Sequence, residues 1–319
     1  MPSAADLAPD IRRFVEQVAA DYARFPSVDG LPPDQARRII EQVRAPWRTG
    51  GPEMAHVHEH LVPCPHGDFR VRLYDPSPAK PKPALLYLHG GGWTFFSLDT
   101  HDRVMREYAA RAGIVVAGID YALSPEAKFP VALEQAATAV RWLHRDGAAF
   151  GVDGARLTLG GDSAGGNLSV AACLKLRDEG DAGLVRGMLL NYPAFEGDCS
   201  DESQDRYGGP GYMLTRDEMR MFWTRYLRSP DDAQNPLAAP LRAQLGGLPP
   251  AFFAVPECDV LTEQSLAMIP KLRDAGVAVT DRLYPGATHS FLEAVSISPT
   301  ADRALADGAA WLRDRLFGG

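Results

Sequence analysis

The sequence predicts an α/β fold in which a mostly parallel eight-stranded sheet carries helices on both faces and a helical cap. From residue 84 onward, helical patterns alternate with six apolar runs, at residues 84–88, 114–119, 157–159, 185–190, 251–255 and 277–283. Continuous apolar strands separated by helices are typical of a parallel sheet that is covered on both sides. An alternating pattern over residues 55–75 predicts two more strands, antiparallel to each other, with a turn near residues 66–68.

Two amphipathic helices are predicted between about residues 7 and 47. Their apolar faces hold Ile11, Phe14, Val15, Val18 and Tyr22 in the first helix, and Ile39, Ile40, Val43 and Trp47 in the second. Residues 194–247 interrupt the later alternation of strands and helices, and a helical pattern at 216–227 makes this insertion a candidate lid. We therefore expect an N-terminal helical cap segment over 1–50, a first part of the core over 51–193, a cap insertion over 194–247 and a second part of the core over 248–319.

The composition is that of an ordinary globular chain with an acidic balance. The 319 residues include 45% hydrophobic and 23% charged residues, and 33 Lys and Arg against 41 Asp and Glu give a formal net charge of −8. An acidic surface repels phosphate backbones and anionic lipid, so we expect no nucleic-acid partner and no membrane partner. No stretch approaches the length of a membrane span, and no secretory signal is visible at the N-terminus. A cytoplasmic location is the expectation.

The cysteine and histidine patterns do not predict a metal site. The four cysteines, Cys64, Cys173, Cys199 and Cys258, are far apart and contain no CxxC pair, so we expect four reduced thiols. Residues 56–60 carry three alternating histidines on one face of a strand, for which a solvated face is a simpler interpretation than a metal site.

A candidate nucleophile lies between a short strand and a helical pattern. Gly161, Ser163 and Gly165 form a G-x-S-x-G motif after the run at 157–159. A serine on a tight strand-to-helix turn is pushed into a cleft, and glycines on either side let the strand and the helix pack closely. A glycine turn with an incidental serine is the alternative at this point.

A glycine-rich loop follows the strand at 84–88, in the sequence His89-Gly90-Gly91-Gly92-Trp93. Consecutive glycines leave backbone N–H groups free to face an oxygen, and acyl transfer needs such donors where negative charge develops on a carbonyl oxygen. The spacing of a phosphate-binding GxxxxGK[ST] or GxGxxG loop is absent. A merely flexible loop remains the alternative.

A serine on such a strand-to-helix turn, called a nucleophile elbow, is followed along the chain by an acid and then by a histidine. The sequence offers both residues in this order, each after a later strand. Asp259 comes after the run at 251–255, and His289 comes after the run at 277–283 and is the only histidine beyond Ser163. Both lie where the carboxyl ends of parallel strands place functional groups. Rival acids are Glu257, Glu263 and Asp281, of which Asp281 lies within a strand; we favour Asp259.

Together these residues resemble the hormone-sensitive-lipase-like family of α/β hydrolases. The resemblance covers about residues 84–317 and rests on HGGGW at 89–93, DYALSPE at 120–126, KFP at 128–130, GDSAGG at 161–166 and the Asp259/His289 pair. LDTHDR at 98–103 and the GDSAGG form look closest to the bacterial acetyl esterases. Two departures, Val260 in place of the usual Pro and Ser290 in place of the usual Gly, remove no reacting group.

The resemblance implies an α/β-hydrolase fold and a Ser-His-Asp triad. Ser163 would be the nucleophile, His289 the base and Asp259 its orienting acid. The amides of Gly91, Gly92 and Ala164 would then form an oxyanion hole.

The implied activity is that of a serine carboxylesterase with a covalent acyl-enzyme, acting on short acyl esters from acetyl to about hexanoyl. It needs no cofactor, its partner is a small-molecule ester, and a homodimer stays open as an assembly. Trp93, Phe95, Tyr192 and Tyr212 are the candidate substrate-binding residues. Two other functions also stay open: an amidase or formamidase that uses the same triad, and a non-catalytic protein that binds a ligand in the cleft.

Overall fold

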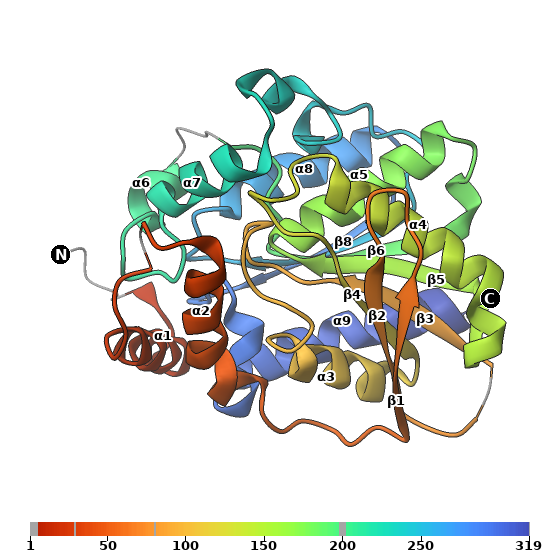
Figure 1. The fold of residues 1–319 in the computed structure, drawn as a ribbon, viewed down its shortest axis with the longest axis horizontal. Helices are drawn as coiled ribbons and strands as arrows, with labels where there is room; N and C mark the ends of the chain where they lie inside the picture. The colour runs from red at the N-terminus through yellow and green to blue at the C-terminus, as the bar shows by residue number, and fades with distance from the viewer. Residues whose placement is uncertain (1–5, 29, 80, 198–201, 319) are drawn as a thin grey trace.

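One eight-stranded sheet runs through the part of the chain that the structure describes. The structure, a computed structural model, describes residues 6–28, 30–79, 81–197 and 202–318. The strand order is β1-β2-β4-β3-β5-β6-β7-β8 (Figure 1). The strands are β1 (His56–Val62), β2 (Phe69–Asp75), β3 (Lys82–Leu88), β4 (Val115–Asp120), β5 (Val152–Asp162), β6 (Val185–Asn191), β7 (Ala251–Pro256) and β8 (Val279–Tyr284).

The pairing of the strands confirms the mostly parallel sheet. β1 pairs with β2, and β2 with β4, in antiparallel register, whereas every pair from β4 to β8 along the sheet is parallel. All seven residues of β3 and all six of β7 are buried, as expected of strands covered on both faces. The edge strand β1 is largely exposed, and its His56 and His58 face solvent.

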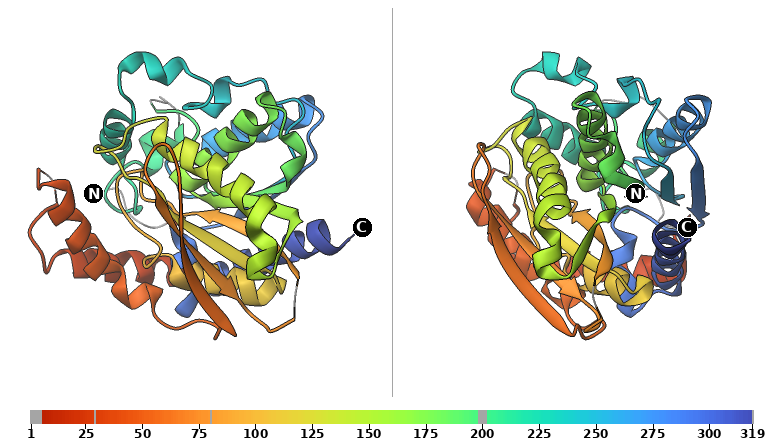
Figure 2. Two further views of the ribbon diagram at one scale, coloured as in Figure 1. Left: turned by 45° about the vertical axis from the view of Figure 1, so that its right-hand side comes forward. Right: turned by 90° about the vertical axis from the view of Figure 1, so that its right-hand side faces the viewer.

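Helices cover both faces of the sheet. On one face, α4 (Val131–Asp146), α5 (Ala164–Asp178) and α8 (Thr262–Asp274) contribute to one apolar core. On the other, α3 (Asp102–Ala112) and α9 (Pro299–Phe317) contribute to a second core (Figure 2). Short 3-10 helices complete the described elements: η2 (Gly147–Phe150), η3 (Ala182–Leu184), η4 (Pro230–Gln234), η5 (Pro240–Arg242) and η6 (Phe291–Ser296).

The two predicted N-terminal helices are present and lie next to the insertion. They are α1 (Pro9–Tyr22) and α2 (Pro33–Arg48), and the insertion contains α6 (Glu202–Tyr207) and α7 (Arg216–Tyr226). In Figure 1 all four lie on the same side of the molecule. The predicted apolar faces are turned inward, except that Tyr22 and Ile39 are only half-buried. The division of the chain at residues 50, 193 and 247 stays a prediction.

The described residues contain no feature typical of a membrane span or of a metal centre. None of the described helices is long and apolar enough to cross a membrane. No group of three or more His, Cys, Asp or Glu side chains in the described ranges could hold a metal ion. Cys64, Cys173 and Cys258 are free and buried, and Cys199 lies outside the described residues.

Candidate active site

The turn between β5 and α5 places Ser163 at the floor of a cavity. Ser163 has a left-handed backbone, with φ 54° and ψ −117°, between the last residue of β5 and the first of α5. A Cβ at Gly161 or at Gly165 would overlap the carbonyl oxygen of Leu88 in β3. The two glycines are therefore needed for the close approach of the elbow to β3, which is what the motif predicts. The Ser163 amide donates to the carbonyl of Asn191, which fixes the turn against β6.

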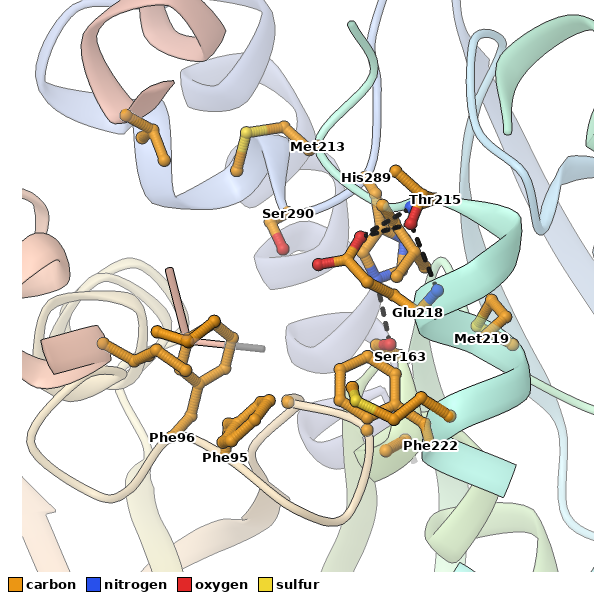
Figure 3. A pocket seen from close by; sticks show the side chains of 18 of the residues that line it. Phe95, Phe96, Ser163, Met213, Thr215, Glu218, Met219, Phe222, His289 and Ser290 are labelled. Carbon is orange, nitrogen blue, oxygen red and sulfur yellow. Dashed lines mark hydrogen bonds between the residues drawn. The ribbon is translucent and has the colours of Figure 1, made fainter. Parts of the chain in front are cut away.

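His289 and Asp259 come to this serine from the ends of neighbouring strands. His289 Nε2 lies 2.9 Å from Ser163 Oγ, and its Nδ1 lies 2.7 Å from a carboxylate oxygen of Asp259 (Figure 3). Asp259 is fully buried, and its other oxygen accepts from the amide of Leu261 at 3.0 Å. The three side chains form one hydrogen-bonded line, with the histidine able to exchange a proton with the serine hydroxyl.

The rival acids have other roles in the structure. Glu257 accepts a hydrogen bond from the amide of Gly286, and Asp281 pairs with Arg273. The third rival, Glu263, lies in the first turn of α8. Among these four carboxylates only Asp259 has a hydrogen bond with His289 within the described residues.

Hydrogen bonds and a ring contact fix the position of the loop that carries His289. The hydroxyl of Thr288 donates to the carbonyls of Cys258 and Tyr212, so it ties this loop both to the Asp259 loop and to the cap insertion. The ring of Tyr192 meets the His289 ring edge to face at 5.0 Å. These contacts restrict the imidazole to the orientation in which both of its nitrogens have a partner.

Three backbone N–H groups next to Ser163 are available to an incoming oxygen. Gly91 and Gly92 have φ of 102° and 59°, and no acceptor for their amides lies among the described residues. Ala164 is the first residue of α5, so its amide has no partner within the helix. A Cβ at Gly92 would overlap the ring of Phe222 in α7. An oxyanion hole formed by these three amides stays a prediction.

Asp162, one residue before Ser163, connects the elbow to the glycine loop. Its buried carboxylate accepts from the amide of Gly90 at 3.1 Å and from the Tyr87 hydroxyl at 2.8 Å, and it pairs with His101 at 3.2 Å. Burial alone would raise the pKa of Asp162, but the His101 charge and the hydrogen bonds lower it below its ordinary value. Burial acts to lower the pKa of His101, and the nearby carboxylate outweighs it and raises that pKa. This link was not predicted from the sequence, although both residues stand in the quoted motifs.

The cavity above Ser163 has a volume of about 660 Å³ and is lined by the core and by both cap segments. Its wall includes residues of α1, α2 and α7, and the rings of Phe95, Phe96 and Phe222 face it (Figure 3). This size is ordinary for a small-molecule site. The two N-terminal helices and the insertion thus both contribute to the wall of this cavity.

The four predicted substrate-binding residues take different positions. Phe95 lines the cavity, and so does Trp93, but the Trp93 ring is buried in a stack with Tyr226 at 4.2 Å. Tyr192 and Tyr212 are not among the residues that line the cavity. The reason is that Tyr192 packs against the His289 ring from within the core, whereas Tyr212 packs against Tyr207. A substrate-binding role for any of the four residues stays a prediction.

Two charged features of the cavity wall were also missed from the sequence. Arg44 of α2 is 5% exposed and pairs at 3.1 Å with Glu293 of η6, which is 4% exposed. Glu218 of α7 also lines the cavity. The Thr215-x-x-Glu218 pattern is a capping-box signal for the start of α7. It could have located the helix but not the direction in which Glu218 points.

Comparisons with known proteins agree with this geometry. The alpha/beta hydrolase fold family matches residues 85–293. A hyperthermophilic esterase from the archaeon Pyrobaculum calidifontis is 33% identical, with a TM-score of 0.90 over 98% of this chain and 99% of that one. A thermostable carboxylesterase cloned from a metagenomic library is 33% identical, with a TM-score of 0.86 over 90% of this chain and 98% of that one. A thermostable esterase from Pseudomonas putida is 30% identical, with a TM-score of 0.89 over 98% of each chain.

The expected kinship with the hormone-sensitive-lipase-like hydrolases is thereby confirmed, while the narrower likeness to acetyl esterases stays a prediction. The match spans more than half of the chain, from β3 to the loop that follows His289. On the fold, the site geometry and these similarities, the chain belongs to the alpha/beta hydrolase fold family.

Proposed function

We propose that the protein is a serine carboxylesterase that hydrolyses short acyl esters. The observation that carries the proposal is the hydrogen-bonded line from Ser163 through His289 to Asp259, at the floor of a largely apolar cavity. The similarity to three named esterases supports an ester as the substrate.

The reaction proceeds in two steps through an acyl-enzyme. His289 Nε2 takes the proton of Ser163 as the hydroxyl oxygen attacks the ester carbonyl, and then gives it to the departing alcohol. A water molecule enters, and the same histidine activates it to release the acid. Asp259 holds the His289 ring through Nδ1–H and stabilises its imidazolium form. The proposed reaction needs no cofactor.

The amides of Gly91, Gly92 and Ala164 donate hydrogen bonds that stabilise the negative charge on the carbonyl oxygen. Each is a donor that is already in place before the reaction, so no reorganisation is needed when charge develops. Removing one such donor costs about 3–4 kcal/mol of transition-state stabilisation. Asp162 supports this arrangement because it binds the Gly90 amide from the elbow side.

We infer a preference for acyl groups from acetyl to about hexanoyl. The ring of Phe222 packs directly on Gly92, and a Cβ at Gly91 would come within 2.9 Å of the Phe96 ring. These rings narrow the space beside the glycine loop, and Phe95 packs against Phe222. A long chain would have to displace them.

The test is the hydrolysis of p-nitrophenyl acetate, butyrate, octanoate and dodecanoate by the wild type and by Ser163→Ala. We expect kcat/KM to fall between butyrate and octanoate, and all activity to be lost in the variant. Equal rates in the two proteins would overturn the proposal. The p-nitroanilide of butyric acid is run in parallel, and a faster rate on it than on the ester would instead favour an amidase.

A further inference from the structure

The charged residues in the cavity wall are all paired except one. Besides the His289–Asp259 pair, the lining includes Arg44, Asp217 and Glu218. Arg44 pairs with Glu293 at 3.1 Å, and Asp217 with Arg220 at 3.4 Å. Within the described residues, Glu218 has no cation within ion-pair distance. The wall therefore carries one carboxylate whose charge is not balanced by a neighbouring side chain.

One oxygen of Glu218 is used for structure and the other is not. Glu218 Oε2 accepts from the amide and from the hydroxyl of Thr215, each at 2.8 Å, which closes the capping box of α7. Among the described residues, Oε1 has no hydrogen-bond donor. Figure 3 shows the Glu218 carboxylate directed into the open space beside His289 and Ser290, above Ser163.

Arg44 does not neutralise this carboxylate. The ion-pair partner of Arg44 among the described residues is Glu293; both side chains are buried, and together they carry no net charge. The positive end of the α7 dipole offsets about half a charge at Glu218. Part of the Glu218 charge is therefore left without a compensating partner among the described residues.

The cavity wall also presents aromatic faces that suit a cation. Phe95, Phe96 and Phe222 line it, and two of these rings already hold cations from the protein: Arg44 lies 5.0 Å from the centre of Phe96, and Arg225 lies 5.7 Å from that of Phe95. For Phe222, no cation contact is found in the described ranges. An unpaired carboxylate beside an aromatic ring is the chemistry that binds an ammonium group.

We propose that this cavity selects esters that carry an ammonium group, held by Glu218, over neutral esters of the same shape. The proposal rests on the proposed esterase function and adds a substrate class to it. The ammonium group can belong to the acyl part or to the alcohol part of the ester, and the test covers both.

The test compares two pairs of isosteric esters by pH-stat titration at low ionic strength. Acetylcholine and 3,3-dimethylbutyl acetate differ by a positive charge on the alcohol side. The methyl esters of 4-(trimethylammonio)butanoic acid and 5,5-dimethylhexanoic acid differ by a positive charge on the acyl side. In at least one pair we expect the cationic ester to have a kcat/KM about tenfold higher, from an attraction of the size of a partly desolvated cation contact.

Glu218→Gln separates charge from structure, because Gln at this position also forms a capping box. In this variant the ratio of kcat/KM between the cationic and the neutral ester of each pair should fall to about twofold or less. Asp205→Asn, which removes an exposed carboxylate from α6 outside the cavity, is the matched control and should keep the preference.

Two results would overturn the proposal: no preference for the cation in either pair with wild type, or a preference that survives Glu218→Gln. Failure of the underlying function has a different signature. In that case the wild type would hydrolyse neither the neutral nor the cationic esters faster than Ser163→Ala does.

Discussion

The buried pair between Arg44 and Glu293 joins the cap to the loop that follows His289, and its removal should be costly. Arg44→Met replaces the apolar stem of the side chain by one of similar width and removes the charged guanidinium group. Glu293, which is 4% exposed, would then be left without its cation. Breaking a buried pair by removing one partner costs about 3–5 kcal/mol, because the remaining charge has lost both water and its counter-ion.

This cost translates into a measurable change in the melting temperature. An unfolding entropy of about 2.1 cal/mol/K per residue gives roughly 0.7 kcal/mol/K for this chain, so Tm should fall by about 4–8 °C. The double variant Arg44→Met/Glu293→Gln removes both charges and should recover most of the loss. The assay is thermal unfolding followed by circular dichroism at pH 7, with one heating rate for all variants. A Tm for Arg44→Met within about 1 °C of wild type would show that the buried pair does not stabilise the fold to this extent.

Three further predictions concern the catalytic groups and their support. Asp259→Asn should lower kcat on p-nitrophenyl butyrate by about 10⁴-fold with little change in KM, because the histidine loses the partner that fixes its tautomer. Gly90→Ala should lower kcat by about 100-fold, since a Cβ there would overlap the Asp162 carboxylate and move the glycine loop. Between pH 6 and 9, the free energy of unfolding, measured with urea, should fall less with rising pH in His101→Gln than in wild type. Because the pKa of His101 is raised in the folded state, its stabilising effect is complete below about pH 6.5 and is lost as pH rises through the folded-state value.

Each of these predictions has a contradicting result. A loss below tenfold in Asp259→Asn would mean that the carboxylate does not orient the base. For Gly90→Ala, an unchanged kcat would show that the loop tolerates the added methyl group. If wild type and His101→Gln lose stability in parallel above pH 6.5, the pair with Asp162 does not titrate in that range.

Much of the fold could be predicted because its signals are local. The strands of a covered parallel sheet are continuous apolar runs, and the strand at 185–190 and the helix at 216–227 were each located to within a residue. The candidate triad could be located for a related reason. Each member follows a strand, and the topology of the sheet brings the ends of β5, β7 and β8 to one edge.

The parts that could not be predicted depend on contacts between distant segments. Asp162 and His101 are 61 residues apart, and nothing in their neighbouring sequence shows that one buried charge faces the other. The same holds for Arg44 and Glu293, which are 249 residues apart. Tyr192 follows a strand, where an aromatic side chain can face either the cavity or the core, and in the structure its ring packs against His289.

The proposed mechanism is tested most directly by identifying the residue that carries the covalent intermediate. Wild type, Ser163→Ala and His289→Ala are incubated with diethyl p-nitrophenyl phosphate and analysed by intact-protein mass spectrometry and peptide mapping. We expect a single diethylphosphoryl group on Ser163 in the wild type, none in Ser163→Ala and much slower labelling in His289→Ala. Rapid labelling of another residue, or labelling of Ser163 that does not depend on His289, would contradict it.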